Sequence, residues 1–481
     1  MRSVLLGNGI NIQFGGKAYT SSYIMQRIKY RARLDAYKKL FADDMTANDI
    51  IKMLEAFVEE ANKLKNDKNY SDYAEDSDSQ SAIKDFQERY KDWEISKPED
   101  VMLEDWFLLV HVFFLKNRDL EEQRQAGIQG FQQLILDAIY NNGRIQEIYK
   151  SMSSYRKVNR HFKAYDNIFT INYDDNMECL TGKRVYHLHG DFSELADSEN
   201  EKTITGYLRN KKGECVVQED MKHVFCNALL NYSGMLKKRV IDENYNKNLA
   251  GEQIVTQYAT DEKCRESIRQ LKEKDPVGYE RIIAKIENPE LYVATPYYFD
   301  VFEQIEDELD IIGVSPNNDA HIFKTIVENT KLKKVTFYYK EPKERQYVEE
   351  NYPKELFECV HVDSLWDRLR CNNNIYINYP MPPRKEIQKF IEIFNKMSES
   401  ESSVDDVIKA VKGLTQKDIN RICAEINNEF SSINPNHISV NYDEFRKENA
   451  AISYVGLQEG IPPTAAYMVW MMGEKKQEKA K

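Results

Sequence analysis

Short apolar runs that end in polar turns recur along the chain. They are LLGNGIN at 5–11, FTINYDD with HLHGD between 169 and 191, and IIGVSPNND at 311–319. An apolar run that stops at such a turn predicts a buried strand that carries polar residues at its carboxyl end. We therefore expect an open parallel sheet whose carboxyl edge holds a nucleotide.

The order of strand and helix patterns supports a parallel sheet. The strand patterns lie at 3–6, 167–171, 185–188, 309–314, 334–339 and 357–362. Helical stretches at 320–329 and 341–351 separate the last three. Such alternation is typical of α/β proteins. We predict a Rossmann-like parallel sheet with large helical insertions in a domain covering 1–377.

Helical periodicity fills the long gaps between the strands. Apolar residues at i, i+3, i+4 and i+7 predict an all-helical insertion over about 42–162, and a mainly helical cap over about 194–289. Within the insertion, the acidic stretch 70–100 indicates a solvated loop between helices, which could alternatively dock a partner.

A second domain is predicted after the proline-rich junction at 378–386. From 385 to 481 the composition indicates a C-terminal helical module. Its last helical pattern, at 464–473, is apolar on all sides. It is therefore either a buried helix or an oligomer contact.

Composition limits the class of protein. The chain has 481 residues, of which 41% are hydrophobic, enough for two or three domains. Its longest apolar runs fall short of the roughly 20 residues that span a bilayer, and the N-terminal run resembles no export signal, so we expect a cytoplasmic protein. A formal charge of −12 argues against a broad nucleic-acid interface.

The cysteines give no sign of a disulfide framework or a structural metal site. There are seven, scattered along the chain and never in a C-x-x-C pair. That pattern fits reduced thiols packed as small apolar residues. We expect no metal.

The first turn, Gly7-Asn8-Gly9 followed by Asn11, could lie against phosphate. Glycines let the backbone approach a pyrophosphate, and amides at the start of a helix attract anions. The turn after the strand at 309–314 could act in the same way, because Gly313 and Ser315 offer backbone and hydroxyl groups to phosphate or ribose.

The second and third strand ends carry the candidate catalytic groups. Asn172 could hold a ribose hydroxyl or a water, and Asp174 could accept from a carboxamide, although both residues also commonly cap turns. In HLHGD we interpret His187 as structural. His189, beside a glycine, suits a proton acceptor because its ordinary pKa leaves it neutral at cytoplasmic pH.

The ordered set GNGIN, TINYD, HLHG and GVSPNND resembles the sirtuin-like family, in particular its bacterial branch used in anti-phage defence. The resemblance covers residues 1 to about 375. It implies that Asn172 orients the nicotinamide ribose or a water, that His189 is the general base, and that Asp174 contacts the carboxamide. Gly7, Asn8, Gly9 and Asn11 would lie along the pyrophosphate, with Gly313 and Ser315 near the adenosine.

Two departures from sirtuins narrow the implied activity. The four-cysteine zinc module that follows the His-Gly pair in deacetylating sirtuins is missing, and the first turn reads GNGIN instead of Gly-Ala-Gly-x-Ser. The resemblance therefore implies NAD⁺ cleavage with water as acceptor, by an effector that acts when phage infection is sensed. Uncontrolled cleavage would kill the host, so we expect an oligomer, a protein activator or a ligand to control it.

Other functions remain open. The fold could capture NAD, ADP-ribose or a signalling nucleotide as a non-catalytic sensor subunit, and GNGIN also resembles the AbiH abortive-infection family. A deacylase is disfavoured by the missing cysteines. A metal-dependent nuclease is disfavoured by the acidic charge and by the lack of a recognisable carboxylate cluster.

Overall fold

The computed structural model describes residues 1–32, 47–67, 69, 74, 77–91, 93–117, 124–215, 217–371, 381–398, 401–433 and 442–479. It divides into two compact units. The first contains Met1–Ile10 and Leu54–Leu369, and the second contains Asn11–Met53 and Arg370–Lys481. The predicted boundary near 377 lies outside the described residues. The grouping of residues 11–53 with the C-terminal helices was not expected.

The first unit is built on a six-stranded, all-parallel sheet. Its strands are β1 (Arg2–Leu6), β2 (Asn167–Thr170), β3 (Tyr186–His187), β4 (Asp307–Ile312), β5 (Leu332–Tyr339) and β6 (Phe357–His361). Their order is β3-β2-β1-β4-β5-β6, which is the order of doubly wound dinucleotide-binding sheets. The predicted α/β class with a Rossmann-like sheet is confirmed.

The direction of winding reverses between β1 and β4. Val4 of β1 pairs with Ile168 of β2 on one side and with Asp310 of β4 on the other. In sheets of this kind, ligands bind outside the carboxyl ends of the strands at such a switch point. The switch point therefore marks where a site is expected.

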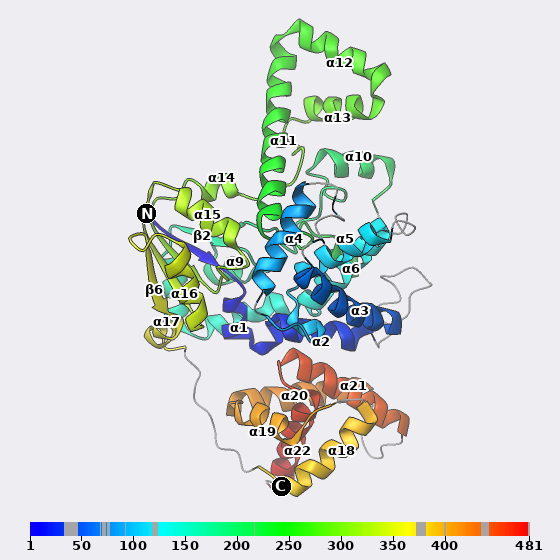
Figure 1. Ribbon diagram of the computed structural model, residues 1–481, viewed down its shortest axis with the longest axis vertical. Coiled ribbons are helices and arrows are strands. Elements are labelled where there is room, and N and C mark those ends of the chain that lie inside the picture. The colour runs from blue at the N-terminus through cyan, green and yellow to red at the C-terminus, as the bar shows by residue number, and fades with distance from the viewer. Residues whose placement is uncertain are drawn as a thin grey trace. The chain divides into compact units, whose positions relative to one another are not determined.

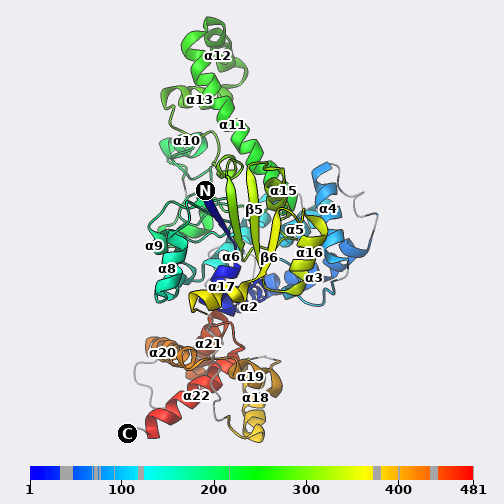
Figure 2. The same ribbon diagram turned by 90° about the vertical axis from the view of Figure 1, so that its left-hand side faces the viewer.

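Apolar residues of the sheet and of its helices form one core. Leu5, Phe169, Ile311 and Phe337 are buried in it together with side chains from the helices that follow β4 and β5. Those helices are α15 (Ala320–Glu328) and α16 (Pro342–Asn351), and α16 packs on β5 and β6 (Figure 2). The remaining short helices of the sheet region are α9 (Asn176–Thr181), α14 (Phe299–Phe302) and α17 (Val362–Leu369).

Between β1 and β2, the regular elements of the described residues are all helical, as predicted. They include α3 (Ala47–Asn66), α4 (Ser77–Tyr90), α5 (Asp105–Lys116), α6 (Arg124–Tyr140), α7 (Ile148–Ser153) and α8 (Arg156–Lys163). The predicted loop at 70–100 is wrong where α4 forms. Ile83, Phe86 and Tyr90 lie three or four residues apart and are all buried, so α4 is an amphipathic helix despite its acidic composition.

The predicted cap is also helical. It contains α10 (Ile204–Lys212), α11 (Gly234–Thr260), α12 (Glu262–Lys274) and α13 (Pro276–Glu287). Figure 1 shows α11 extending away from the sheet toward α12 and α13. The first turns of α11 thus belong to the region of the sheet, while its far end belongs to a helical arm.

The second unit has its own helical core. Besides η1 (Lys17–Tyr19) and α2 (Ser21–Ala32), it contains α18 (Arg384–Ser398), α19 (Val404–Lys412), α20 (Gln416–Ile433), α21 (Tyr442–Gln458) and α22 (Pro463–Lys479). Ala465, Val469 and Trp470 of α22 are buried in this core, which accounts for the apolar pattern of that helix. Among the described helices, none is long and apolar enough to cross a membrane.

Candidate functional site

The glycines of the first turn pack against the turn after β4. The N–H of Gly7 donates to the carbonyl oxygen of Ile312 at 2.9 Å, and the N–H of Gly9 donates to that of Gly313 at 3.0 Å. A Cβ on Gly9 would lie only 2.5 Å from the Cα of Gly313. These contacts explain the glycines without a ligand, so their predicted contact with pyrophosphate stays a prediction.

The other residues predicted near phosphate and ribose are distributed between the two units. Asn8 and Ser315 are half-buried in loops that follow β1 and β4, next to the switch point. Asn11 is buried and belongs to the second unit. The structure therefore brings Asn8, Gly313 and Ser315 to one sheet edge, and assigns Asn11 to the other unit.

Asn172 follows β2 and is positioned through its backbone. Its carbonyl oxygen accepts a hydrogen bond from Nδ1 of His187 at 3.0 Å, and its N–H donates to the hydroxyl of Thr170. The side chain is half-buried, and its amide makes no hydrogen bond with another described residue. That amide is thus available for a ligand.

His187 holds this loop in place, in agreement with the structural interpretation. Its Nε2 lies 2.7 Å from Oε1 of Glu178 on α9. Burial disfavours the charged imidazolium, but the hydrogen bond and the charge of Glu178 outweigh burial and raise the pKa of His187 to about 9. His187 therefore links α9 to the backbone of Asn172.

Asp174 is engaged within its own turn. It is buried, and its Oδ1 accepts hydrogen bonds from the N–H and the side-chain amide of Asn176 at the start of α9. This geometry agrees with the turn-capping alternative. A contact of Asp174 with a carboxamide stays a prediction.

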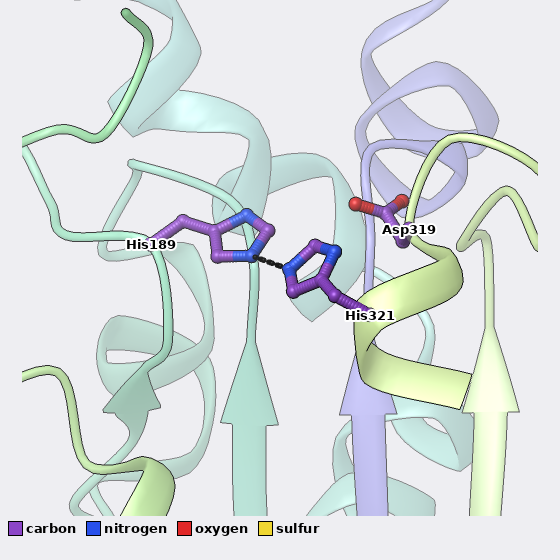
Figure 3. Close-up of side chains that lie close together, drawn as sticks. All are labelled: His189, Asp319 and His321. Atoms are coloured by element: carbon purple, nitrogen blue, oxygen red, sulfur yellow. Dashed lines mark hydrogen bonds between the residues drawn. The ribbon is translucent and has the colours of Figure 1, made fainter. Parts of the chain in front are cut away.

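His189 belongs to a polar cluster with His321 and Asp319 (Figure 3). It is 2% exposed, and its Nε2 lies 3.0 Å from Nε2 of His321, the second residue of α15. Asp319 immediately precedes α15, and ligand atoms of the three side chains all lie within 4.8 Å of one another. The loops after β3 and β4 thus meet across β2 and β1, and these three residues could hold a metal ion.

Charge in this cluster is controlled by burial and by one lysine. Burial, followed by the positive charge of Lys237 on α11, lowers the pKa of His189 well below its ordinary value and that of His321 to about 3. Burial raises the pKa of Asp319, against the effect of Lys237. Lys237 is itself buried, and its Nζ lies 3.9 Å from Oε1 of Glu104. Both imidazoles are therefore neutral at neutral pH.

A polar cavity of about 150 Å³ lies beside the β3 loop. His187 and Gly190 line it, together with Asp191, Lys202 and Tyr298. His189 lies between two of these residues in sequence but faces the cluster with His321. The cavity offers space for a small polar group next to the loop that carries His189.

Sequence reasoning missed His321 and Lys237. His321 lies 132 positions after His189, on the apolar face of a helix, where a histidine is ordinarily part of the core. The sequence did place His321 two residues after Asp319, at the start of a predicted helix. Comparison with known protein families, with curated proteins and with solved structures finds no match to this chain.

Proposed function

We propose that the protein is an NAD⁺ glycohydrolase that cleaves the bond between nicotinamide and ribose, with water as the acceptor. The observation that carries the proposal is the position of a neutral His189 beside the loop of Asn172, on the carboxyl edge of a sheet with dinucleotide-binding strand order. The sirtuin-like resemblance of the same segments supports the choice of NAD⁺.

In this reaction the protein must stabilise the ribose cation and must accept a proton from water. Loss of nicotinamide leaves an oxocarbenium-like ribose, which a nearby dipole can stabilise and which water then attacks. The amide of Asn172 would orient the ribose hydroxyl or the water. A neutral imidazole at position 189 would accept the proton that the attacking water loses, giving nicotinamide, ADP-ribose and one proton.

His189 is almost fully buried, so access to it must be controlled. Hydrolysis requires that the ribose and one water reach an imidazole that is 2% exposed. We propose that the protein acts as an effector of anti-phage defence and that an infection signal, a partner or an oligomer opens the site. Such control would fit an enzyme whose uncontrolled depletion of NAD⁺ would kill the host.

The engagement of His189 with His321 favours one alternative, a nucleotide-binding sensor that cleaves nothing. The test is release of nicotinamide from NAD⁺ by the purified full chain, alone and in lysate from phage-infected cells. Asn172→Ala and His189→Ala are the test variants. His361→Ala, which changes a half-buried histidine at the end of β6, is the control.

Cleavage that both test variants abolish and the control retains would support the hydrolase. Absence of cleavage in both conditions, while NAD⁺ or ADP-ribose still binds, would overturn it in favour of the sensor.

A further inference from the structure

Two histidines and one aspartate converge from distant parts of the chain. His189 follows β3, while Asp319 and His321 begin α15. Two imidazole nitrogens with one carboxylate are a ligand set that proteins use for Zn²⁺ and Fe²⁺, often with further coordination positions open to water. We propose that these three residues bind one divalent transition-metal ion.

The distance between the imidazoles fits a shared ion. Metal–nitrogen bonds to Zn²⁺ are about 2.0–2.1 Å long, so two ligating nitrogens at an angle near 90° lie about 3 Å apart. The two Nε2 atoms are 3.0 Å apart. A small turn of either ring can therefore exchange the hydrogen bond for a common ion.

A second observation points to a missing partner at this place. Nδ1 of His321 is buried and has no hydrogen bond with any described residue. Burying such a nitrogen without a partner costs free energy. Figure 3 shows the carboxylate of Asp319 facing the ring of His321. Coordination through Nε2 would place the ring proton of His321 on Nδ1, where the facing carboxylate can accept it, and the ion would neutralise the charge of that half-buried carboxylate.

The surrounding charges act in both directions. Lys237 acts electrostatically on all three ligands, Lys238 also acts on His321, and Arg89 acts on Asp319. These positive charges oppose a cation, whereas Glu104 beside Lys237 partly offsets them. We therefore expect weaker binding than at a closed structural zinc site.

A metal ion bound at this site would prevent His189 from acting as the proposed catalytic base. This consequence rests on the proposed function. An ion bound at His189 uses the lone pair that would otherwise accept a proton from water. Zn²⁺ should then inhibit NAD⁺ cleavage, and a chelator should restore it.

The experiment measures the ion directly and needs no NAD⁺. The full chain is stripped with a chelator, dialysed and titrated with Co²⁺, whose visible spectrum reports nitrogen and oxygen ligands. Bound Zn²⁺ is counted by elemental analysis. His321→Ala and Asp319→Asn are compared with wild type and with His361→Ala, and circular dichroism checks that each variant is folded. Asparagine at 319 keeps the shape of the side chain and the polar start of α15.

We expect one ion per wild-type or His361→Ala chain, and affinity at least about ten-fold weaker in both test variants. Failure of the wild-type chain to bind Co²⁺ or Zn²⁺ would overturn the site. Binding by both variants with the affinity of the wild-type chain would also overturn it. If a variant does not fold, the wild-type spectrum still decides, because a chain without a Co²⁺ spectrum has no such site. Ion binding by a chain that still does not cleave NAD⁺ after a chelator has removed the ion, alone or in lysate from infected cells, would leave the site standing and reject only the hydrolase.

Discussion

The N–H of Gly9 donates a hydrogen bond to the carbonyl oxygen of Gly313 at 3.0 Å, so the loops that follow β1 and β4 touch with no side chain between them. Gly313 also has a φ of +71°, which side chains other than glycine rarely adopt. At the switch point of the sheet, the two loops are thus in direct backbone contact.

Gly9→Ala should destabilise the first unit by about 1–3 kcal/mol. The added methyl group would meet the Cα of Gly313 at 2.5 Å, and backbone atoms cannot move aside as a flexible side chain can. Urea unfolding followed by tryptophan fluorescence measures the loss. Gly413→Ala is the matched control, because a Cβ at Gly413 meets nothing closer than 3.5 Å. A loss no larger than that of the control would contradict the packing argument.

Arg89→Met should cost about 3–5 kcal/mol, the range for breaking a buried ion pair. Arg89 makes two hydrogen bonds of 2.7 Å to the carboxylate of Asp105, which is fully buried and also accepts from Tyr90. Unfolding of the single variant is compared with that of Arg89→Met combined with Asp105→Leu. The double variant should recover part of the loss, because it buries no unpaired charge; an equal or larger loss would show that the charge is not the cause.

His161 should make stability fall as the solution becomes more acidic. Burial, followed by the charges of Arg2 and Arg368, lowers its pKa to about 4 in the folded chain, against about 6.5 when unfolded. Below about pH 6.5, His161 is therefore protonated in the unfolded chain. In the folded chain it becomes protonated only below about pH 4. Between pH 7 and 5 this costs about 2 kcal/mol.

The measurement is the free energy of unfolding of wild type and of His161→Gln at both pH values. Glutamine does not titrate, and it can keep a hydrogen bond with the hydroxyl of Tyr165, which lies 3.2 Å from Nε2 of His161. The variant should gain relative to wild type on acidification. A difference that stays constant with pH would refute the assignment.

Lys237→Met should strengthen Co²⁺ binding at the proposed metal site. The lysine is buried and its charge acts on His189, Asp319 and His321, so its removal lowers the electrostatic cost of adding a cation. Affinity from a Co²⁺ titration should rise about ten-fold, equivalent to about 1.4 kcal/mol. Lys238→Met, which keeps Lys237, should change it less. Unchanged or weaker binding by Lys237→Met would count against an ion at this place.

The sheet could be predicted because each strand carries its own local signal. Runs such as VLL before Gly7 and DII before Gly313 are apolar, short and followed by turn residues, and the structure places β1 and β4 there. Local pattern also gave the helical insertion and the C-terminal helices. The prediction was wrong at 77–90. There we gave the acidic composition more weight than the helical spacing of Ile83, Phe86 and Tyr90.

The candidate site could be predicted only in part, because its residues meet through the winding of the sheet. His189 and Asn172 belong to neighbouring strands, and both carry a chemical signal next to a turn. His321 meets His189 only because the loops after β3 and β4 reach over the same edge, and no local pattern contains that information. The grouping of residues 11–53 with the C-terminal helices was missed for the same reason, because the sequence of an apolar helix face does not show which element it packs against.

The central position of β1 has a consequence for how the chain is made. Ser3 pairs with Asn167 and with Leu309, so β1 is synthesised before both of its neighbouring strands. At about 5–20 residues per second, the second neighbour emerges roughly 15–60 s later. During that interval the apolar segment Val4 to Leu6 lacks at least one of its neighbouring strands, which makes this protein a candidate client for chaperones that bind nascent chains.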